Sequence, residues 1–279
     1  MQRINNLLRL GLCLLCISAP NVLAQARIVS TDAAVTQIVF ALGVDTDLAA
    51  IDVTSTLPPG YRELPVVGYH RALAAEGLLA LNPSLVIGSQ HIGPPKVLAS
   101  LASAGIPVLQ LPGAHTIAEL KDNIEQIAAA TGAESRAEVA LAELDKQTVQ
   151  LSASALHTER VAFVLAVEPG KMRIAGNGTA GEAFIKLLGA KNIADFDAYR
   201  TLSAEAILDL APTVILVAAR EGASAEQVLE MNAILQYGQA ARSGRIVQVN
   251  AANLTAGLSP EAVAEAVAIA ESLKHMPEL

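Results

Sequence analysis

The chain has 279 residues, of which 52% are hydrophobic and 16% are charged. This length and composition fit one or two folded domains and exclude a disordered chain. The 19 basic and 27 acidic residues give a net charge of -8, and only 3% of residues are aromatic. The cationic, aromatic surface that nucleic acid requires is therefore excluded.

The first 26 residues have the features of a secretory signal peptide. Two arginines and no acid precede an apolar stretch at 10–17, and small residues follow. This stretch is shorter than the ~20 residues that cross a bilayer. We predict cleavage after Ala24 or Ala26, which removes both cysteines and leaves an exported chain without disulfides.

Two segments of the remaining chain repeat each other. Residues 75–88 and 204–217 are identical at five of fourteen positions, and most other positions exchange one apolar residue for another. Each copy predicts a short helix, a proline-containing turn and a buried strand. A weaker repeat pairs 31–43 with 179–189, each a helix opened by threonine and ended by glycine. The chain therefore predicts two similar α/β lobes.

A helical region separates the two lobes. Thr116 and Glu119 form a capping-box pattern that opens one helix, and Gly132 ends it. More than twenty residues without glycine or proline follow, so a long helix is predicted between the lobes. We assign 27–132 to the first lobe, 133–157 to the interdomain helix and 158–279 to the second lobe.

The predicted strands alternate with helices, as in α/β folds with parallel sheets. They are 27–29, 85–88, 108–111, 161–167, 214–218 and 246–249. We therefore expect two Rossmann-like lobes joined by a long interdomain helix, with a ligand cleft between the lobes.

Three motifs in the first lobe carry a resemblance. They are Gly68-Tyr69-His70-Arg71, Ala75-Glu76-Gly77 and a loop at 89–95 that reads Ser-Gln-His-Ile-Gly-Pro-Pro. In order and spacing they resemble the periplasmic haemin-binding proteins of bacterial ABC haem importers. The resemblance implies a monomeric periplasmic protein, not an enzyme, that captures haem between its lobes. It also implies delivery of haem to an ABC permease and its ATPase in the inner membrane.

The resemblance makes Tyr69 the axial ligand of the haem iron. Phenolate is a hard donor that suits ferric iron, and tyrosine is a known haem ligand. Arg71 lies two residues further on, which is the same side of an extended chain. Its charge favours the phenolate, or it pairs with a haem propionate. The alternative is that Tyr69 packs its ring and Arg71 is solvated.

The histidines give less specific signals. On an extended chain His70 points away from Tyr69, which favours a solvent-facing or loop-packing role over contact with haem. His91 matches the histidine of the family's Gly-Pro-Pro loop, so it either contacts haem or makes a structural hydrogen bond. His115, His157 and His275 are predicted to lie on the surface or at helix ends.

Glu76 and Glu205 occupy the same position in the two repeats. The resemblance implies that one exposed acid on each lobe docks on the permease. The alternative is that each glutamate stabilises a helix N-terminus.

Two further segments need separate interpretations. Residues 176–181 match Gly-x-Gly-x-x-Gly, with Asp195 about twenty residues after the first glycine. We predict a turn that opens a helix, because a dinucleotide site requires a clear strand directly before the glycines. Near the C-terminus the family often has Gly-x-Gly-Pro-Arg, whereas Glu261 stands here in place of the arginine. This change alters a contact to propionate or to the second lobe.

The sequence leaves other ligands open. A ferric siderophore or cobalamin carrier is the alternative within the same class, and a zinc or manganese site would need convergent histidines and carboxylates. A secreted α/β enzyme is disfavoured, because the chain lacks the Gly-x-Ser-x-Gly and His-Glu-x-x-His motifs. Candidates for second-lobe contacts are Tyr199, Arg220, Met231 and Tyr237.

Overall fold

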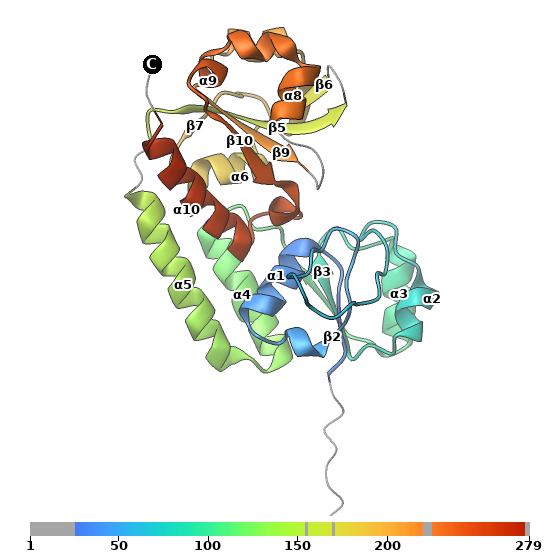
Figure 1. The fold of residues 1–279 in the computed structure, drawn as a ribbon. Helices are drawn as coiled ribbons and strands as arrows, with labels where there is room; N and C mark the ends of the chain where they lie inside the picture. Colours follow the sequence, from blue (N-terminus) through green and yellow to red (C-terminus); the bar gives the residue numbers. More distant parts are fainter. Residues whose placement is uncertain (1–25, 154–155, 169–170, 220–224, 277–279) are drawn as a thin grey trace, which may run out of the picture.

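The computed structural model describes residues 26–153, 156–168, 171–219 and 225–276, and it consists of two α/β lobes (Figure 1). The predicted signal peptide and Arg220 lie outside these residues, apart from residue 26. No helix of the described ranges is long and apolar enough to cross a membrane.

The first lobe is built on a four-stranded parallel sheet with the order β2-β1-β3-β4. Residues such as Val86 and Ile87 of its inner strand are fully buried, as expected for a sheet covered on both faces. Its elements are β1 (Ile28–Ser30), α1 (Ala33–Ala41), η1 (Asp45–Asp47), β2 (Leu48–Ala50), α2 (Ala75–Ala80), β3 (Leu85–Ser89), α3 (Pro95–Ser103), β4 (Val108–Leu111) and α4 (Ile117–Thr131).

The second lobe has a mixed sheet with the order β10-β9-β5-β6-β8, and β7 pairs with β5. β5, β9 and β10 are parallel, whereas β6 and β8 run antiparallel to their neighbours. Its elements are β5 (Arg160–Glu168), β6 (Lys171–Ala175), α6 (Ala180–Leu187), β7 (Lys191–Asn192), β8 (Tyr199–Leu202), α7 (Ala204–Asp209), β9 (Val214–Ala219), α8 (Ala225–Met231), η2 (Ala233–Tyr237), α9 (Gln239–Arg242), β10 (Ile246–Asn250), η3 (Ala251–Leu254) and α10 (Pro260–Lys274).

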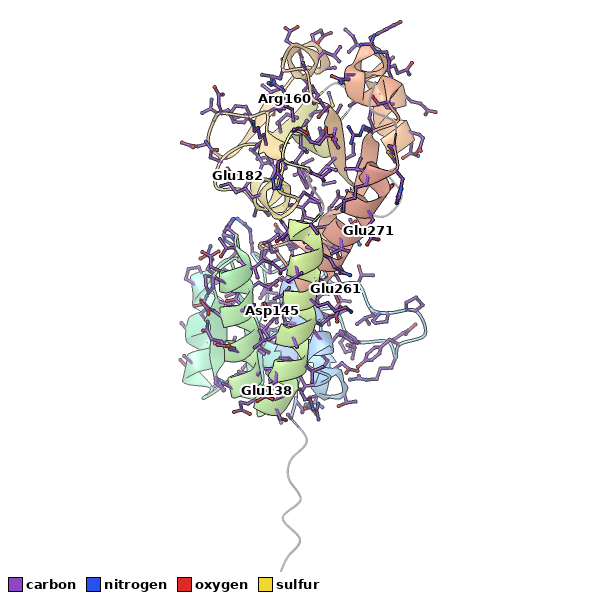
Figure 2. All side chains as sticks on the ribbon, turned by 90° about the vertical axis from the view of Figure 1, so that its left-hand side faces the viewer. Glu138, Asp145, Arg160, Glu182, Glu261 and Glu271 are labelled. Atoms are coloured by element: carbon purple, nitrogen blue, oxygen red, sulfur yellow. The ribbon has the colours of Figure 1, made fainter. Side chains whose placement is uncertain are left out.

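Helix α5 (Glu134–Ser152) connects the lobes. Its 19 residues span about 28 Å at 1.5 Å per residue. The predicted capping box between Thr116 and Glu119 opens α4, and Gly132 ends α4 in the left-handed conformation with φ 68°. Figure 2 shows Glu138 and Asp145 on the outer side of α5, where Asp145 forms an ion pair with Lys121 of α4.

The last helix, α10, contacts both lobes. It packs against α5 and α6 and also against α1 of the first lobe, and Figure 1 shows it beside α5. Buried residues of α4, α5 and α10, such as Ile127, Leu144 and Ile269, belong to one apolar cluster that reaches both sheets. The two lobes therefore share a core.

The predicted repeat is confirmed as α2–β3 and α7–β9, two equally long helices followed at equal spacing by strands. Asn82 and Ala211 stand at equivalent places between helix and strand, and both have positive φ values, 46° and 44°. In the weaker repeat, glycine follows the end of each helix as predicted, and both glycines have positive φ, 62° at Gly43 and 72° at Gly189. The expected threonine cap was wrong for the first copy, because Asp32 caps α1 through its side chain.

Candidate binding site

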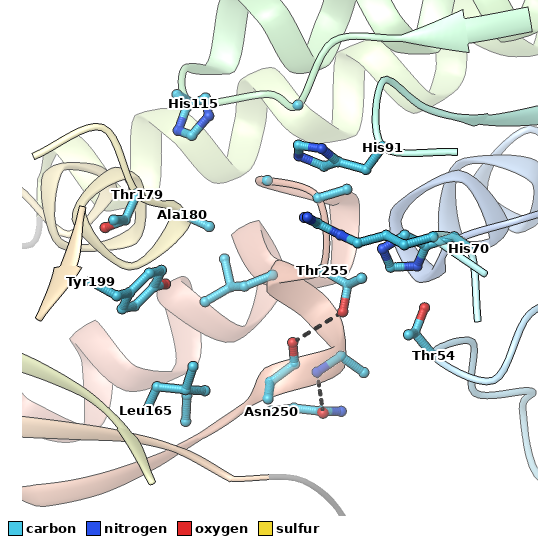
Figure 3. Close-up of a pocket in the computed structure, with 18 of the residues that line it drawn as sticks. Thr54, His70, His91, His115, Leu165, Thr179, Ala180, Tyr199, Asn250 and Thr255 are labelled. Carbon is cyan, nitrogen blue, oxygen red and sulfur yellow. Dashed lines mark hydrogen bonds between the residues drawn. The ribbon is translucent and has the colours of Figure 1, made fainter. Parts of the chain in front are cut away.

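A cavity of about 770 Å³ lies between the two lobes, with its lining drawn from both. This volume is within the range of small-molecule pockets. Figure 3 shows His70 and His91 on one side of the cavity and Tyr199 and Leu165 on the other.

Tyr69 and Arg71 both line the first-lobe side of the cavity. Tyr69 keeps 41% of its surface exposed. The predicted extended chain was wrong here, because Gly68 has φ 94° and the Ala72 N–H donates to the Tyr69 carbonyl at 2.8 Å. This turn puts the Tyr69 and His70 rings side by side, with 4.3 Å between their centroids. The two side chains thus do not point in opposite directions.

His70 is buried with 4% of its surface exposed, so its solvent-facing interpretation was wrong and it packs within the loop. Its Nδ1 atom lies 3.3 Å from Oδ2 of Asp52, which is completely buried. The Asp52 carboxylate also accepts hydrogen bonds from backbone and hydroxyl groups of Thr54 and Ser55. Sequence reasoning missed Asp52, although Asp-x-Thr-Ser is a turn pattern in which the aspartate side chain bonds nearby backbone. Asp52 holds the His70 ring against the wall of the cavity.

Two more histidines line the cavity from neighbouring loops, His91 after β3 and His115 before α4. Burial lowers the pKa of His91, and the charges of Arg71 and His70 lower it further. A neutral imidazole keeps a lone pair free to accept a hydrogen bond or bind a metal. His115 is exposed beside the start of α4, as predicted, but its place in the cavity was not predicted.

The second lobe supplies an apolar floor to the cavity. Phe163, Leu165 and Ala218 face the cavity from β5 and β9, where Leu165 is in register with both Ala218 and Arg173. The Arg173 guanidinium lies 5.3 Å from the centroid of the Tyr199 ring. The Tyr199 hydroxyl accepts a hydrogen bond from the Gly181 N–H at 3.3 Å, and burial raises the pKa of this phenol.

Of the other second-lobe candidates, Met231 and Tyr237 are exposed and do not line the cavity. Sequence reasoning missed Arg173, since no local pattern indicates that it lies beside Tyr199.

The charges in the cavity have one sign. Within the described residues no aspartate or glutamate lines it, whereas Arg71 and Arg173 do. Neither arginine forms an ion pair with any other described residue. No group of three or more histidines, cysteines or carboxylates in the described ranges is arranged to hold a metal ion. The cavity therefore suits a partly apolar molecule that carries negative charge.

The glycine motif at 176–181 forms a turn that opens a helix, as predicted. Thr179 caps α6, and the Glu182 carboxylate accepts a hydrogen bond from the Gly178 N–H. The strand before the turn, β6, was not predicted and pairs antiparallel with β5. A dinucleotide site is built on parallel strands with a crossover helix, so this turn lacks that setting.

The segment 257–261 joins the lobes below the cavity. The Leu258 N–H donates to the Ala114 carbonyl at 2.7 Å, and Ser259 caps α10. Glu261 is half-buried with carboxylate atom Oε2 lacking a hydrogen-bond partner, and burial raises the pKa of this group. In the structure Glu261 does not line the cavity.

Glu76 and Glu205 are both exposed in the first turns of α2 and α7, at equivalent positions of the two lobes. Hydrogen bonds from its own backbone N–H and from Ser203 lower the pKa of Glu205.

The family model described as periplasmic binding protein matches residues 28–252. The chain belongs to the periplasmic binding protein family. This family comprises the substrate-binding proteins of transport systems, including carriers of the vitamin B12 and heme class.

Relatives of this periplasmic binding protein include proteins named for heme and proteins named for vitamin B12. The crystal structure of the periplasmic heme binding protein HutB of Vibrio cholerae is 35% identical, with a TM-score of 0.82 over 90% of this chain and 99% of that one. A periplasmic heme binding protein from Pseudomonas aeruginosa is 30% identical, with a TM-score of 0.81 over 91% of this chain and 94% of that one. A vitamin B12-binding protein from Pectobacterium atrosepticum is 24% identical, over 80% of each chain.

Proposed function

We propose that this periplasmic binding protein captures haem in the cavity between its lobes and delivers it to an ABC permease. Haem is a flat, largely apolar molecule with two propionates and a ferric iron. The observation that carries the proposal is the cavity lining, which combines an exposed tyrosine, two arginines and an apolar floor without a carboxylate. The similarity to two heme binding proteins at 30% identity or more supports the same ligand.

Tyr69 is the proposed axial ligand. Tyr69 is 41% exposed and lines the cavity, and Arg71 lines it from the same lobe. A phenolate oxygen is a hard donor that suits ferric iron, and tyrosine is a known haem ligand. His70 and His91 are the alternative ligands, since both line the same wall.

A haemin titration of residues 27–279, followed by visible absorption, tests the proposal. We expect a saturable Soret shift with a tyrosinate-type charge-transfer band, and Tyr69→Ala should remove the band and weaken binding by at least about tenfold, roughly 1.4 kcal/mol. Tyr237→Ala is the matched control, because Tyr237 is 76% exposed and lies outside the cavity. Absence of a shift would exclude haem, whereas equal spectra for both variants would move the ligand to a histidine.

Cobalamin is the second candidate, because the Pectobacterium atrosepticum relative is a vitamin B12-binding protein. Equilibrium dialysis against cyanocobalamin, in the buffer of the haemin titration, separates the two. Tighter binding of cyanocobalamin than of haemin would replace the haem proposal. A ferric siderophore stays the remaining alternative if neither ligand binds.

Glu76 and Glu205 are proposed to dock on the permease, one from each lobe. Their equivalent, exposed positions on α2 and α7 support two-point contact. The charge-reversed double variant Glu76→Lys with Glu205→Lys should lose binding to the importer reconstituted in nanodiscs and keep haemin binding. Glu138→Lys, on the outer side of α5, is the control.

A further inference from the structure

Arg173 lines the cavity, but the ligand contacts proposed above give it no role. It stands on β6, in register with Leu165 of β5 on one side and Thr201 of β8 on the other. Side chains alternate along a strand, so Arg173 lies on the face opposite to the buried Met172 and Ile174. That face is the floor of the cavity, and Arg173 is its cationic residue within the described lining.

The surroundings of Arg173 orient its guanidinium without using its hydrogen bonds. The guanidinium lies over the Tyr199 ring at 5.3 Å, and the Tyr199 hydroxyl is held by the Gly181 N–H. Stacking on an aromatic face fixes the plane of an arginine while its N–H groups stay free. Among the described residues, no hydrogen bond or ion pair to this guanidinium is present.

A stacked arginine of this kind matches a carboxylate. The planar fork of N–H donors binds both oxygens of a carboxylate at once, and the apolar residues beside it strengthen the interaction by excluding water. Phe163 and Leu165 supply that apolar surface on the same floor. Arg71 is the cation of the opposite wall, so the two arginines approach a ligand from different lobes.

We infer that Arg173, positioned by Tyr199, is the specificity residue of the second lobe and binds a carboxylate of the ligand. The inference rests on the proposed function, in which that carboxylate is a haem propionate. The second lobe thus recognises the acidic edge of the ligand, and the first lobe supplies the iron ligand. A neutral ester of the same porphyrin cannot form the ion pair with Arg173 but keeps the apolar contacts.

Haemin and haemin dimethyl ester, titrated into the same protein, test this assignment. Arg173→Gln should weaken haemin binding by about tenfold, as for loss of one charge-assisted interaction, and change ester binding by less than about twofold. Arg173→Lys should lie in between, because lysine keeps the charge and lacks the fork. In the unaltered protein haemin should bind several-fold more tightly than the ester, a comparison that needs no variant to fold.

Arg200→Gln is the matched control. Arg200 also stacks on an aromatic ring, that of Phe196 at 4.9 Å, but it does not line the cavity. Equal affinities of Arg173→Gln and Arg200→Gln for haemin would overturn the inference, as would an equal loss for haemin and ester. If the unaltered protein binds neither porphyrin, the proposed function itself fails. The two failures are therefore distinguishable.

Discussion

At Gly257 the backbone of the second lobe passes directly against that of the first. Gly257 has φ 119°, and a Cβ atom added there would lie 2.5 Å from the Ala114 carbonyl oxygen and 2.6 Å from the Ala114 nitrogen. A Cβ atom on Gly113 would likewise meet the Ala256 carbonyl oxygen at 2.6 Å. The hydrogen bond from Leu258 to Ala114 closes the same crossing. We therefore expect Gly257→Ala to destabilise the junction between the lobes.

The expected loss has two parts. A φ of 119° is nearly restricted to glycine, and holding alanine there costs about 1–3 kcal/mol. Displacing backbone from a contact below 3 Å costs about 1–3 kcal/mol more, as in an overpacked core. The free energy of unfolding should fall by about 2–6 kcal/mol, and each kcal/mol lowers the melting temperature by roughly 2–4 °C in a chain of this size.

Urea denaturation followed by far-ultraviolet circular dichroism measures this loss. Gly105→Ala is the control for backbone conformation alone, because Gly105 has φ 73° and no atom within 4 Å of an added Cβ. It should cost about 1–2 kcal/mol, so Gly257→Ala should unfold at clearly lower urea. Equal midpoints for the two variants would refute the tight crossing between the lobes.

Three further predictions concern titratable groups around the site. The His91 imidazole should titrate below 6.5 in NMR spectra, because burial and the positive charges of Arg71 and His70 lower its pKa. Arg71→Gln should raise the midpoint of this titration, and an unchanged midpoint would contradict the contribution of the Arg71 charge. Asp52→Ala leaves the buried His70 ring and partly buried donors of Thr54 and Ser55 unpaired. It should lower the free energy of unfolding by about 3 kcal/mol in urea, whereas a loss below about 0.5 kcal/mol would refute the anchoring role of Asp52. Burial raises the pKa of Glu261 in the folded state, so the unfolded chain releases this proton at lower pH. The free energy of unfolding should therefore fall as the pH rises from about 4.5 towards the folded-state pKa. Glu261→Gln should flatten that part of the stability profile, and an unchanged slope would contradict this contribution of Glu261.

The parts of the fold that local patterns determine were predicted from the sequence. The six predicted strands all exist as β1, β3, β4, β5, β9 and β10, because each is a short run rich in β-branched and other apolar residues. β6 and β8 were missed because charged residues, such as Arg173 and Arg200, interrupt their apolar pattern. Their antiparallel pairing depends on how the chain returns along β5, which residue types do not specify.

The first-lobe side of the site was predicted in more detail than the second-lobe side, where Tyr199 was a candidate and lines the cavity. Motifs placed Tyr69, Arg71 and His91 together, and all three line the cavity. Their roles toward a ligand stay predictions. Asp52 and Arg173 were missed because each acts through a partner that is distant along the chain, His70 in one case and Tyr199 in the other. Such pairs arise from turn geometry and sheet register, so a single sequence does not contain them as a local pattern.

The two lobes are joined at several points, so we expect side-chain movements, rather than a large rotation of the lobes, to accommodate a ligand. Besides α5, the lobes are joined by α10 packed on α1, by the shared apolar core, and by the Leu258–Ala114 hydrogen bond. The Gln37 amide also donates to Asn253 at 2.9 Å, and Asn253 in turn donates to the Glu265 carboxylate. Opening the cavity by rotation breaks these interactions together, which opposes large movement. Exposed side chains at the cavity, such as Tyr69, can change rotamer without that cost, so we expect them to adjust when a ligand enters.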